Sequence, residues 1–290
     1  MASNTVVIHK YEIIEKIGVG GFSTVYKARH KITGKLVALK IVKVREHSKT
    51  ILNESKILSF LNREIGARTA DFFPTIHWYG MFGKMTCLAT TLFAGSFADV
   101  LRGETSTLER LDVCSQMIEL MHHIHHLNVI HCDVKPDNFL TNDSGKLVLI
   151  DFGMARMCVD PDTGEHIPNR VSNTFFGTPK YVSFHLHLGN RPSRRDDLIS
   201  VGYIMMMVFG IELPWLDNHF DDSKELYDIR HEANLYKLEM KQLEFLITYL
   251  TPLSRDCHNY LIPYFKGVYA LKYEDAPDYS LYNSIFNTLF

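Results

Sequence analysis

The residues with the clearest chemistry lie between His131 and Asn138, a stretch that reads HCDVKPDN. Asp133 offers a carboxylate that could accept the proton of a substrate hydroxyl within hydrogen-bond reach. Lys135 follows two residues later, where its ammonium could offset charge on a transferring phosphoryl group. Asn138 offers an amide oxygen to Mg²⁺, which prefers oxygen ligands and keeps some from substrate phosphates. The spacing predicts phosphoryl transfer to a hydroxyl, with Asp133 as the base.

A second acidic motif, Asp151-Phe152-Gly153, directly follows an apolar run that ends at Ile150. Asp151 is the predicted main ligand of Mg²⁺. Either motif alone is common by chance. Their order in the chain, with Asp151 lying 18 residues after Asp133 and a strand lysine upstream, makes coincidence implausible.

Three glycines, Gly18, Gly20 and Gly21, stand between the first two predicted strands. Glycines let the backbone approach a polyphosphate closely, but such a hairpin is more often only a turn. A dinucleotide-binding loop would open a helix and carry a third glycine. Here Ser23 takes that position and both flanks read as strands, so the dinucleotide interpretation fails.

Lys40 ends the apolar run Val37-Ala38-Leu39 on the third predicted strand. A lone lysine at a strand end is usually a solvated charge. Glu54, 14 residues later on a predicted helix, changes this interpretation. A helix packed on the strand can point Glu54 at Lys40 and hold the ammonium against the α- and β-phosphates of a nucleotide.

The elements that must position these residues follow from periodicity. Residues 11–45 are rich in β-branched and aromatic residues broken by glycines, which favours strands. Residues 49–62 carry an apolar stripe that includes Ile51, Leu58 and Leu61, as in an amphipathic helix. The predicted strands of this part are 11–18, 23–30, 35–44, 75–82 and 85–91.

The pattern changes after about residue 94. Residues 108–128 predict a long helix, 139–142 and 147–150 short strands, and 151–190 a largely loop-like segment. Residues 197–210 are apolar nearly all round, which predicts a buried helix. We therefore predict a single α+β functional unit made of two lobes, a sheet-rich lobe at 1–93 and a mostly helical lobe at 94–290, with a nucleotide held between them.

Composition narrows the class of protein. The 290 residues are 46% hydrophobic and 22% charged, with a formal net charge of −2, so no nucleic-acid partner is expected. The five cysteines are odd in number and form no C-x-x-C pair, which favours a reducing compartment. Neither a signal peptide nor a membrane-length apolar run is visible, so we expect no membrane contact. A monomer in the cytoplasm, with the nucleus as a second location, is the expectation.

Taken together, these motifs resemble the eukaryotic protein kinases and, more narrowly, the casein kinase I family. The resemblance extends from about residue 11 to 290. The narrower match rests on four stretches: His131–Leu140 (HCDVKPDNFL), Gly177–Gly189 (GTPKYVSFHLHLG), Ser193–Gly202 (SRRDDLISVG) and Tyr273–Leu281 (YEDAPDYSL). It implies the bilobal protein-kinase fold, ATP with Mg²⁺ as the phosphoryl donor, and serine or threonine in protein substrates as the acceptor.

The resemblance also assigns roles by position. Lys40, Glu54, Asp133 and Lys135 would be catalytic, and Asn138 and Asp151 would bind Mg²⁺. Asp197 would anchor the backbone of the catalytic loop. Ala38 and Leu140 would sandwich the adenine, backbone groups of Thr91 and Phe93 would hydrogen-bond it, and Thr90 would guard the back of the slot. The full nucleotide set is Ile17, Gly18, Gly20, Gly21, Val25, Ala38, Lys40, Thr90, Thr91, Phe93, Leu140 and Ile150.

Departures from the family pattern bear on activity and substrate. Cys132 stands where most kinases have arginine before the catalytic aspartate, and Ser23 replaces the third glycine. A nucleotide-binding pseudokinase scaffold therefore stays as the alternative function. Lys180 replaces a usual arginine, and the segment after Trp215 is acidic. An anion pocket for acidic or phosphate-primed substrates would consist of Lys180, Arg194 and Lys224.

Two further side-chain groups have competing interpretations. His122 and His126 are four residues apart on the predicted helix and could clamp a metal, although packing is the better explanation because no third ligand is obvious. Arg194 and Arg195 are equally well interpreted as a solvated pair or as part of an anion pocket.

Overall fold

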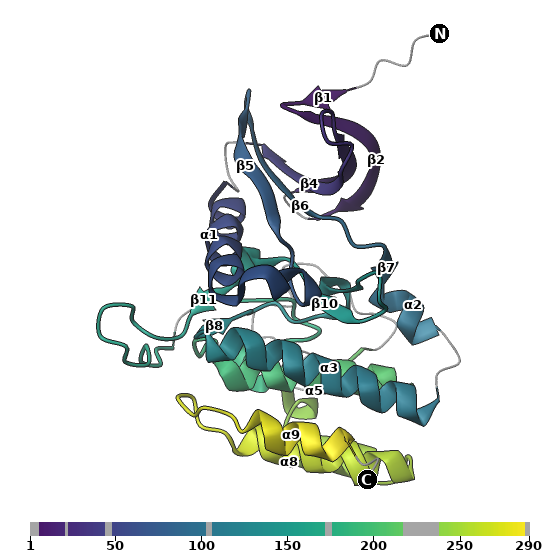
Figure 1. Cartoon of the computed structure of the whole chain (residues 1–290). Helices are drawn as coiled ribbons and strands as arrows, with labels where there is room; N and C mark the ends of the chain where they lie inside the picture. Colours follow the sequence, from purple (N-terminus) through teal and green to yellow (C-terminus); the bar gives the residue numbers. More distant parts are fainter. Residues whose placement is uncertain are drawn as a thin grey trace. The chain divides into compact units, whose positions relative to one another are not determined.

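The computed structural model describes residues 6–20, 23–43, 48–102, 106–171, 176–216 and 238–287 (Figure 1). The chain divides into two compact units. The first comprises Met1–Gly95 with Leu140–Ala155, and the second comprises Ser96–Phe139 with Arg156–Phe290. The segment 140–155, which includes Asp151, thus groups with the sheet-rich unit, whereas the predicted boundary after residue 93 places it with the helical part.

The first unit contains a six-stranded antiparallel sheet in the order β1-β2-β3-β4-β6-β5, which is visibly curled in Figure 1. Alternate residues face its core: Val37 and Leu39 of β4 and Ala89 of β6 are almost fully buried. Gly34 turns the chain between β3 and β4 with φ +71°, a conformation that glycine adopts without strain. The strands are β1 (Val7–Ile8), β2 (Tyr11–Val19), β3 (Thr24–His30), β4 (Leu36–Lys43), β5 (Ile76–Phe82) and β6 (Met85–Thr91).

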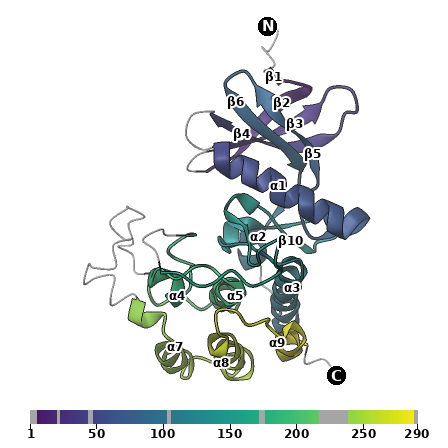
Figure 2. The same ribbon diagram turned by 90° about the vertical axis from the view of Figure 1, so that its left-hand side faces the viewer.

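Helix α1 (Ser48–Ile65) lies along this sheet, as Figure 2 shows, and contacts β4, β5 and β6. The predicted stripe of Ile51, Leu58 and Leu61 is fully buried. A 3₁₀ turn, η1 (Gly66–Asp71), follows the helix. A small sheet in the order β10-β9-β7 and another 3₁₀ turn surround Asp151; their bounds are β7 (Gly95–Ser96), β9 (Phe139–Thr141), β10 (Leu147–Leu149) and η3 (Phe152–Met154).

The second unit is mostly helical. Helix α3 (Thr107–His126) begins at a capping box formed by Ser106 and Glu109, and it packs against α5 and α9. Helix α5 (Arg194–Val208) is buried nearly all round, as its apolar sequence predicts. The remaining elements are α2 (Phe97–Arg102), β8 (Val129–Ile130), η2 (Pro136–Asn138), β11 (Arg156–Met157), α4 (Phe184–His187), α7 (Leu243–Leu250), η5 (Cys257–Leu261), α8 (Ile262–Ala270) and α9 (Tyr279–Phe286).

The predicted α+β fold is confirmed, with a curled sheet in one unit and helices in the other. Helix α5 begins three residues earlier than predicted, because Ser193 and Asp196 form a capping box there. The short α4 and β11 were not predicted within the loop-like segment. No helix in the described ranges is long and apolar enough to cross a membrane. All five cysteines are buried free thiols.

Candidate active site

Lys40 of β4 is the centre of a charged triad in the first unit. Its Nζ donates to Glu54 Oε2 at 2.8 Å and to Asp151 Oδ1 at 2.8 Å. Burial alone would lower the pKa of Lys40, but the attraction of Glu54 and Asp151 outweighs it and raises the pKa above 10.5. The Lys40 ammonium therefore stays charged, as contact with phosphate requires.

Glu54 is the buried member of this triad, with a side chain only 7% exposed. Burial raises its pKa to about 7, although the Lys40 ammonium acts in the opposite direction. Asp151 is 42% exposed and is therefore the carboxylate of the pair that a bound metal ion could reach.

The backbone at Asp151 adopts the left-handed conformation, with φ +61°, and its Oδ1 accepts from the N–H of Gly153 at 3.3 Å. Asn53 of α1 supports the following turn. Its amide Nδ2 lies 3.4, 3.1 and 2.9 Å from the carbonyl oxygens of Phe152, Gly153 and Ala155. Sequence reasoning missed Asn53; its signal was a polar residue directly before Glu54, on the face of the helix that must pack.

The glycine loop lies in the hairpin between β2 and β3, so strands flank it as predicted. Gly18 pairs with Val25 in the ladder, and the N–H of Gly20 donates to the Ser23 carbonyl at 2.8 Å. Gly21 lies outside the described residues. A Cβ on Gly20 would lie 3.2 Å from Ser23 Oγ, so a larger residue at position 20 would crowd the Ser23 side chain.

The expected adenine positions also belong to the first unit. Ala38 faces Thr90 across the β4–β6 ladder, and Val37 faces Thr91. The N–H of Thr91 donates to the Thr75 carbonyl at 3.0 Å, so this group is already engaged. The other expected positions lie in the strands or their connections: Ile17 in β2, Val25 in β3, Phe93 after β6, Leu140 in β9 and Ile150 after β10.

In the second unit, Asp133 is held through both carboxylate oxygens. Thr178 Oγ1 donates to its Oδ1 at 2.7 Å, and Lys135 Nζ donates to its Oδ2 at 2.7 Å. Lys135 Nζ also lies 3.1 Å from Thr178 Oγ1, which closes a triangle of three side chains. The predicted pair of Asp133 and Lys135 is thus brought together. Thr178 was missed, although it stands in the quoted stretch Gly177–Gly189.

Asn138 completes this loop from the turn η2. Its amide nitrogen donates to the Asp133 carbonyl at 2.8 Å, which leaves its Oδ1 as the end suited to a metal ion. Gly177, with φ +86°, passes so close that a Cβ there would lie 2.7 Å from the Cys132 carbonyl. Only glycine lets the segment before Thr178 approach the loop in this way.

Asp197 of α5 anchors the loop backbone, as the resemblance implied. Its Oδ2 accepts from the N–H of His131 at 2.6 Å and its Oδ1 from the N–H of Cys132 at 3.0 Å. These bonds stabilise Cys132 at φ +66°, an uncommon conformation for a residue with a side chain. His125, which directly precedes His126 in α3, lies 3.0 Å from Asp197 Oδ2 through Nε2 and 2.6 Å from the Tyr279 hydroxyl through Nδ1.

The expected anion pocket is described only in part, because Lys224 and the acidic segment after Leu216 lie outside the described residues. Lys180 is half-buried, and its carbonyl accepts from Trp215 Nε1 at 2.8 Å. Arg194 is buried, and its guanidinium donates to Asn128 Oδ1 at 2.7 Å. The structure therefore places Arg194 in a protein contact rather than in solvent.

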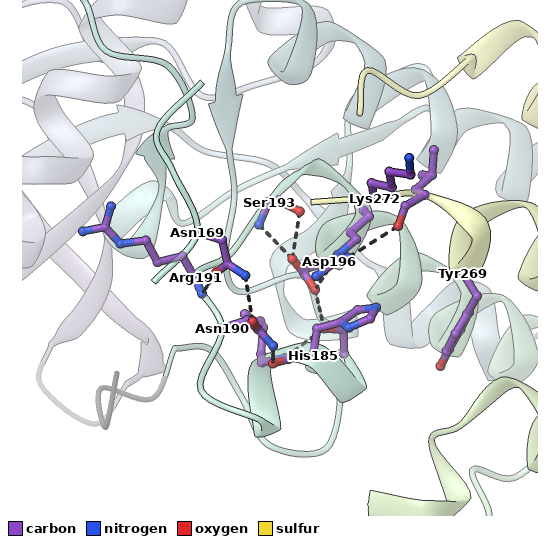
Figure 3. Close-up of polar contacts among 12 residues, drawn as sticks. Asn169, His185, Asn190, Arg191, Ser193, Asp196, Tyr269 and Lys272 are labelled. Carbon is purple, nitrogen blue, oxygen red and sulfur yellow. Dashed lines mark hydrogen bonds and ion pairs between the residues drawn. The ribbon is translucent and has the colours of Figure 1, made fainter. Parts of the chain in front are cut away.

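Figure 3 shows the surroundings of the neighbouring residue Asp196, whose carboxylate accepts from the N–H and hydroxyl of Ser193 at 2.8 and 3.0 Å. Arg195 lies 3.4 Å from the Leu271 carbonyl and over the Tyr273 ring. The solvated-pair interpretation is wrong for both arginines. His122 stacks on Tyr279, and no group of three metal-binding side chains occurs in the part of the chain that the structure describes.

Residues 11–262 match the family model for the protein kinase domain. The match covers both units and includes the Lys40 triad and the Asp133 triangle. The chain therefore belongs to the protein kinase domain family, a class of phosphotransferases that act on proteins.

Proposed function

We propose that the protein is a serine/threonine kinase of casein kinase I type, transferring the γ-phosphoryl group of Mg²⁺-bound ATP to Ser or Thr hydroxyls of proteins. The observation that carries the proposal is the triangle of Asp133, Lys135 and Thr178. It orients one carboxylate with a hydroxyl and an ammonium at 2.7 Å, which is the preorganisation that a catalytic base needs.

The chemistry assigns a task to each group. Asp133 accepts a hydrogen bond from the acceptor hydroxyl and takes its proton as the new O–P bond forms and the bond to the β-phosphate oxygen breaks. Lys135 stabilises negative charge on the moving phosphoryl group. Lys40 binds the α- and β-phosphates, and Glu54 keeps its ammonium in place.

The residues present also suit magnesium. Asp151 would supply carboxylate oxygens and Asn138 its amide oxygen, both of which are hard ligands that Mg²⁺ prefers. The metal, when bound, neutralises phosphate charge. Asn138 fits this role because its amide nitrogen is occupied by the Asp133 carbonyl, so its oxygen points the other way.

The alternative, a pseudokinase scaffold, predicts nucleotide binding without turnover. The retained set of Lys40, Glu54, Asp133, Asn138 and Asp151 favours catalysis, because scaffolds usually lack one of these residues. The deciding experiment is transfer of radiolabelled phosphate from ATP to casein or to the protein itself, followed by phosphoamino-acid analysis. Label on serine or threonine is the expected result. Binding of ATP with no label would support the scaffold, and label on tyrosine would contradict the proposed specificity.

Acidic or phosphate-primed proteins are the proposed substrates, with Lys180 as one contact for the priming phosphate. A hydrogen bond to a charged group is worth about 1.5–3 kcal/mol, so Lys180→Ala should cut the preference for a primed peptide roughly ten- to a hundredfold. The measurement compares kcat/KM for a peptide with phosphoserine three residues before the acceptor with its unphosphorylated twin. An unchanged ratio would place the phosphate contact elsewhere.

A further inference from the structure

Lys241 is a fully buried lysine in the second unit that the proposed chemistry does not use. Its Nζ donates to the carbonyl oxygens of Pro179 and Val182, both at 2.8 Å, and lies 3.1 Å from His187 Nε2. The Nζ atom also lies 5.0 Å from the centre of the Trp215 ring. None of these contacts, all with described residues, is a carboxylate.

A buried lysine without a carboxylate partner is rare, because removing the charge from water is costly. Burial lowers the pKa of Lys241 well below 10.5. A neutral amine has two N–H groups and one lone pair, and the site offers two carbonyl acceptors and one imidazole nitrogen that can donate. The three contacts therefore satisfy the hydrogen-bonding capacity of the Lys241 amine, with His187 donating or accepting according to its tautomer.

The two carbonyls bracket the stretch that follows the Asp133 triangle. Pro179 comes directly after Thr178, and Val182 comes two residues after Lys180. The carbonyl of Lys180, between them, accepts from Trp215 Nε1 at 2.8 Å. The side chains of Lys241 and Trp215 thus donate hydrogen bonds to three backbone carbonyls between residues 179 and 182. Lys241 and Trp215 also contact each other.

Most kinases would carry Ala-Pro-Glu in the part of the chain that here reads Gly177–Gly189 (GTPKYVSFHLHLG), and this stretch contains no glutamate. Ser183 instead caps α4 and bonds Asp196. Lys241 contributes polar contacts at Pro179 and Val182, and His187 also hydrogen-bonds the Pro179 backbone.

We propose that Lys241 is a positioning residue that fixes the backbone of residues 178–182, so that Thr178 stays on Asp133 and the stretch presents a fixed surface to the acceptor peptide. The inference rests on the proposed function in taking the acceptor to be a protein. The positioning itself can be tested without any activity measurement.

The first test is limited trypsin digestion of the full chain, following cleavage of the Lys180–Tyr181 bond by mass spectrometry. Lys241→Met keeps the length and apolar packing of the side chain but removes both donors. Two lost hydrogen bonds should raise the cleavage rate at this bond roughly tenfold or more. Lys266→Met, on an exposed position of α8, is the matched control and should leave the rate unchanged.

The second test distinguishes an effect on the protein substrate from an effect on ATP binding. Lys241→Met should raise KM for casein roughly tenfold while the Kd for ATP, measured by titration, stays at the wild-type value. If the wild-type protein transfers no phosphate, the proposed function is wrong. The trypsin experiment still tests the positioning role of Lys241 in that case, because it needs no activity.

Unchanged cleavage at Lys180–Tyr181 in a folded Lys241→Met protein would overturn the proposal. If this variant lacks a native thermal transition, Lys241→Gln replaces it, because its amide retains donors and should give cleavage between the wild-type and the faster rate. Loss of the fold in both variants would show that Lys241 serves core stability alone, which also overturns the proposal.

Discussion

Lys40 binds two carboxylates that come from distant parts of the sequence, Glu54 and Asp151, each at 2.8 Å. The three charges are unequal in exposure, and this separates their tasks. The buried Glu54 orients the ammonium, while the half-exposed Asp151 keeps access to a cation. At the scale of the residue, catalysis depends on charge placed before the nucleotide arrives.

Lys40→Ala and Asp151→Asn should each reduce phosphate transfer by about a thousandfold or more, since phosphoryl transfer depends mainly on positioning and charge. Both variants should keep a wild-type circular dichroism spectrum. Transfer of radiolabelled phosphate to casein is the measurement, with Lys16→Ala on the exposed part of β2 as the control. Near-normal turnover in either variant would refute the assignment of the site.

Glu54 should produce an acid limb in the pH profile of kcat/KM, because its pKa is raised to about 7 by burial. Below that pH the carboxyl is protonated and loses its ion pair with Lys40, so activity should fall by about tenfold per pH unit. Glu54→Gln should have low activity with no such limb. A wild-type profile that is flat from about pH 5.5 to 8 would contradict the prediction.

Glu54 also makes the free energy of unfolding depend on pH. Here the effect runs opposite to that on activity, because stability falls as pH rises. Because the folded pKa of Glu54 lies above its unfolded value of about 4.3, the folded state binds more protons between these two values. The contribution of Glu54 to the free energy of unfolding is therefore fully present below the unfolded pKa and is lost as pH rises through about 7. Comparing denaturation of wild type and Glu54→Gln at several pH values isolates this contribution.

At the scale of the element, the catalytic loop contacts the segment after Asp151 at Gly177. Cys132 is buried and Gly177 packs on its carbonyl. Arg156 of β11 lies over the Phe176 ring at 3.9 Å, a cation–π contact between the two ends of the segment. We expect these contacts to order the segment, as a phosphate bound by arginine does in many kinases.

Activity should therefore not depend on phosphorylation of the segment 151–185. Cys132 cannot make the charged two-pronged contact by which an arginine would hold a phosphate there. Phosphatase-treated enzyme should match untreated enzyme in kcat/KM for casein, with mass spectrometry to verify that phosphate has been removed. A large loss of activity on removal of phosphate from this segment would contradict the prediction that activity is independent of its phosphorylation.

At the scale of the whole molecule, the C-terminal helix supports the catalytic loop. Tyr279 of α9 bonds His125 of α3, which bonds Asp197 of α5, which in turn holds the loop backbone at His131 and Cys132. Burial lowers the pKa of His125, so this chain passes through a neutral imidazole. Three helices and the loop thus share one buried polar network.

Tyr279→Phe should lower the free energy of unfolding by about 1–3 kcal/mol, because it leaves the Nδ1 of His125 buried and unpaired. The phenyl ring can keep the stacking on His122, so the loss reports the hydroxyl. Urea denaturation is the measurement, and Tyr79→Phe at an exposed position is the matched control. Equal midpoints for Tyr279→Phe and wild type would show that the network does not stabilise the fold.

Local sequence determined much of this protein. The β-branched and aromatic residues of 11–45, broken by glycines, predicted β2 to β4, the stripe of Ile51, Leu58 and Leu61 predicted α1, and the spacing of Asp133 and Asn138 predicted the catalytic loop. These signals are readable because each depends on neighbours within one strand, helix or turn. The match to the protein kinase domain over residues 11–262 agrees with them.

Only the tertiary structure decided which buried polar groups serve the site. Asn53, Thr178, His125 and Lys241 belong to common residue types with no local pattern around them. Their partners lie far along the chain: 99 residues for Asn53 to Phe152, 45 for Thr178 to Asp133, 72 for His125 to Asp197 and 62 for Lys241 to Pro179. A buried hydrogen-bonding group must be paired, but periodicity shows only that a position is buried, and folding alone brings its partner to it.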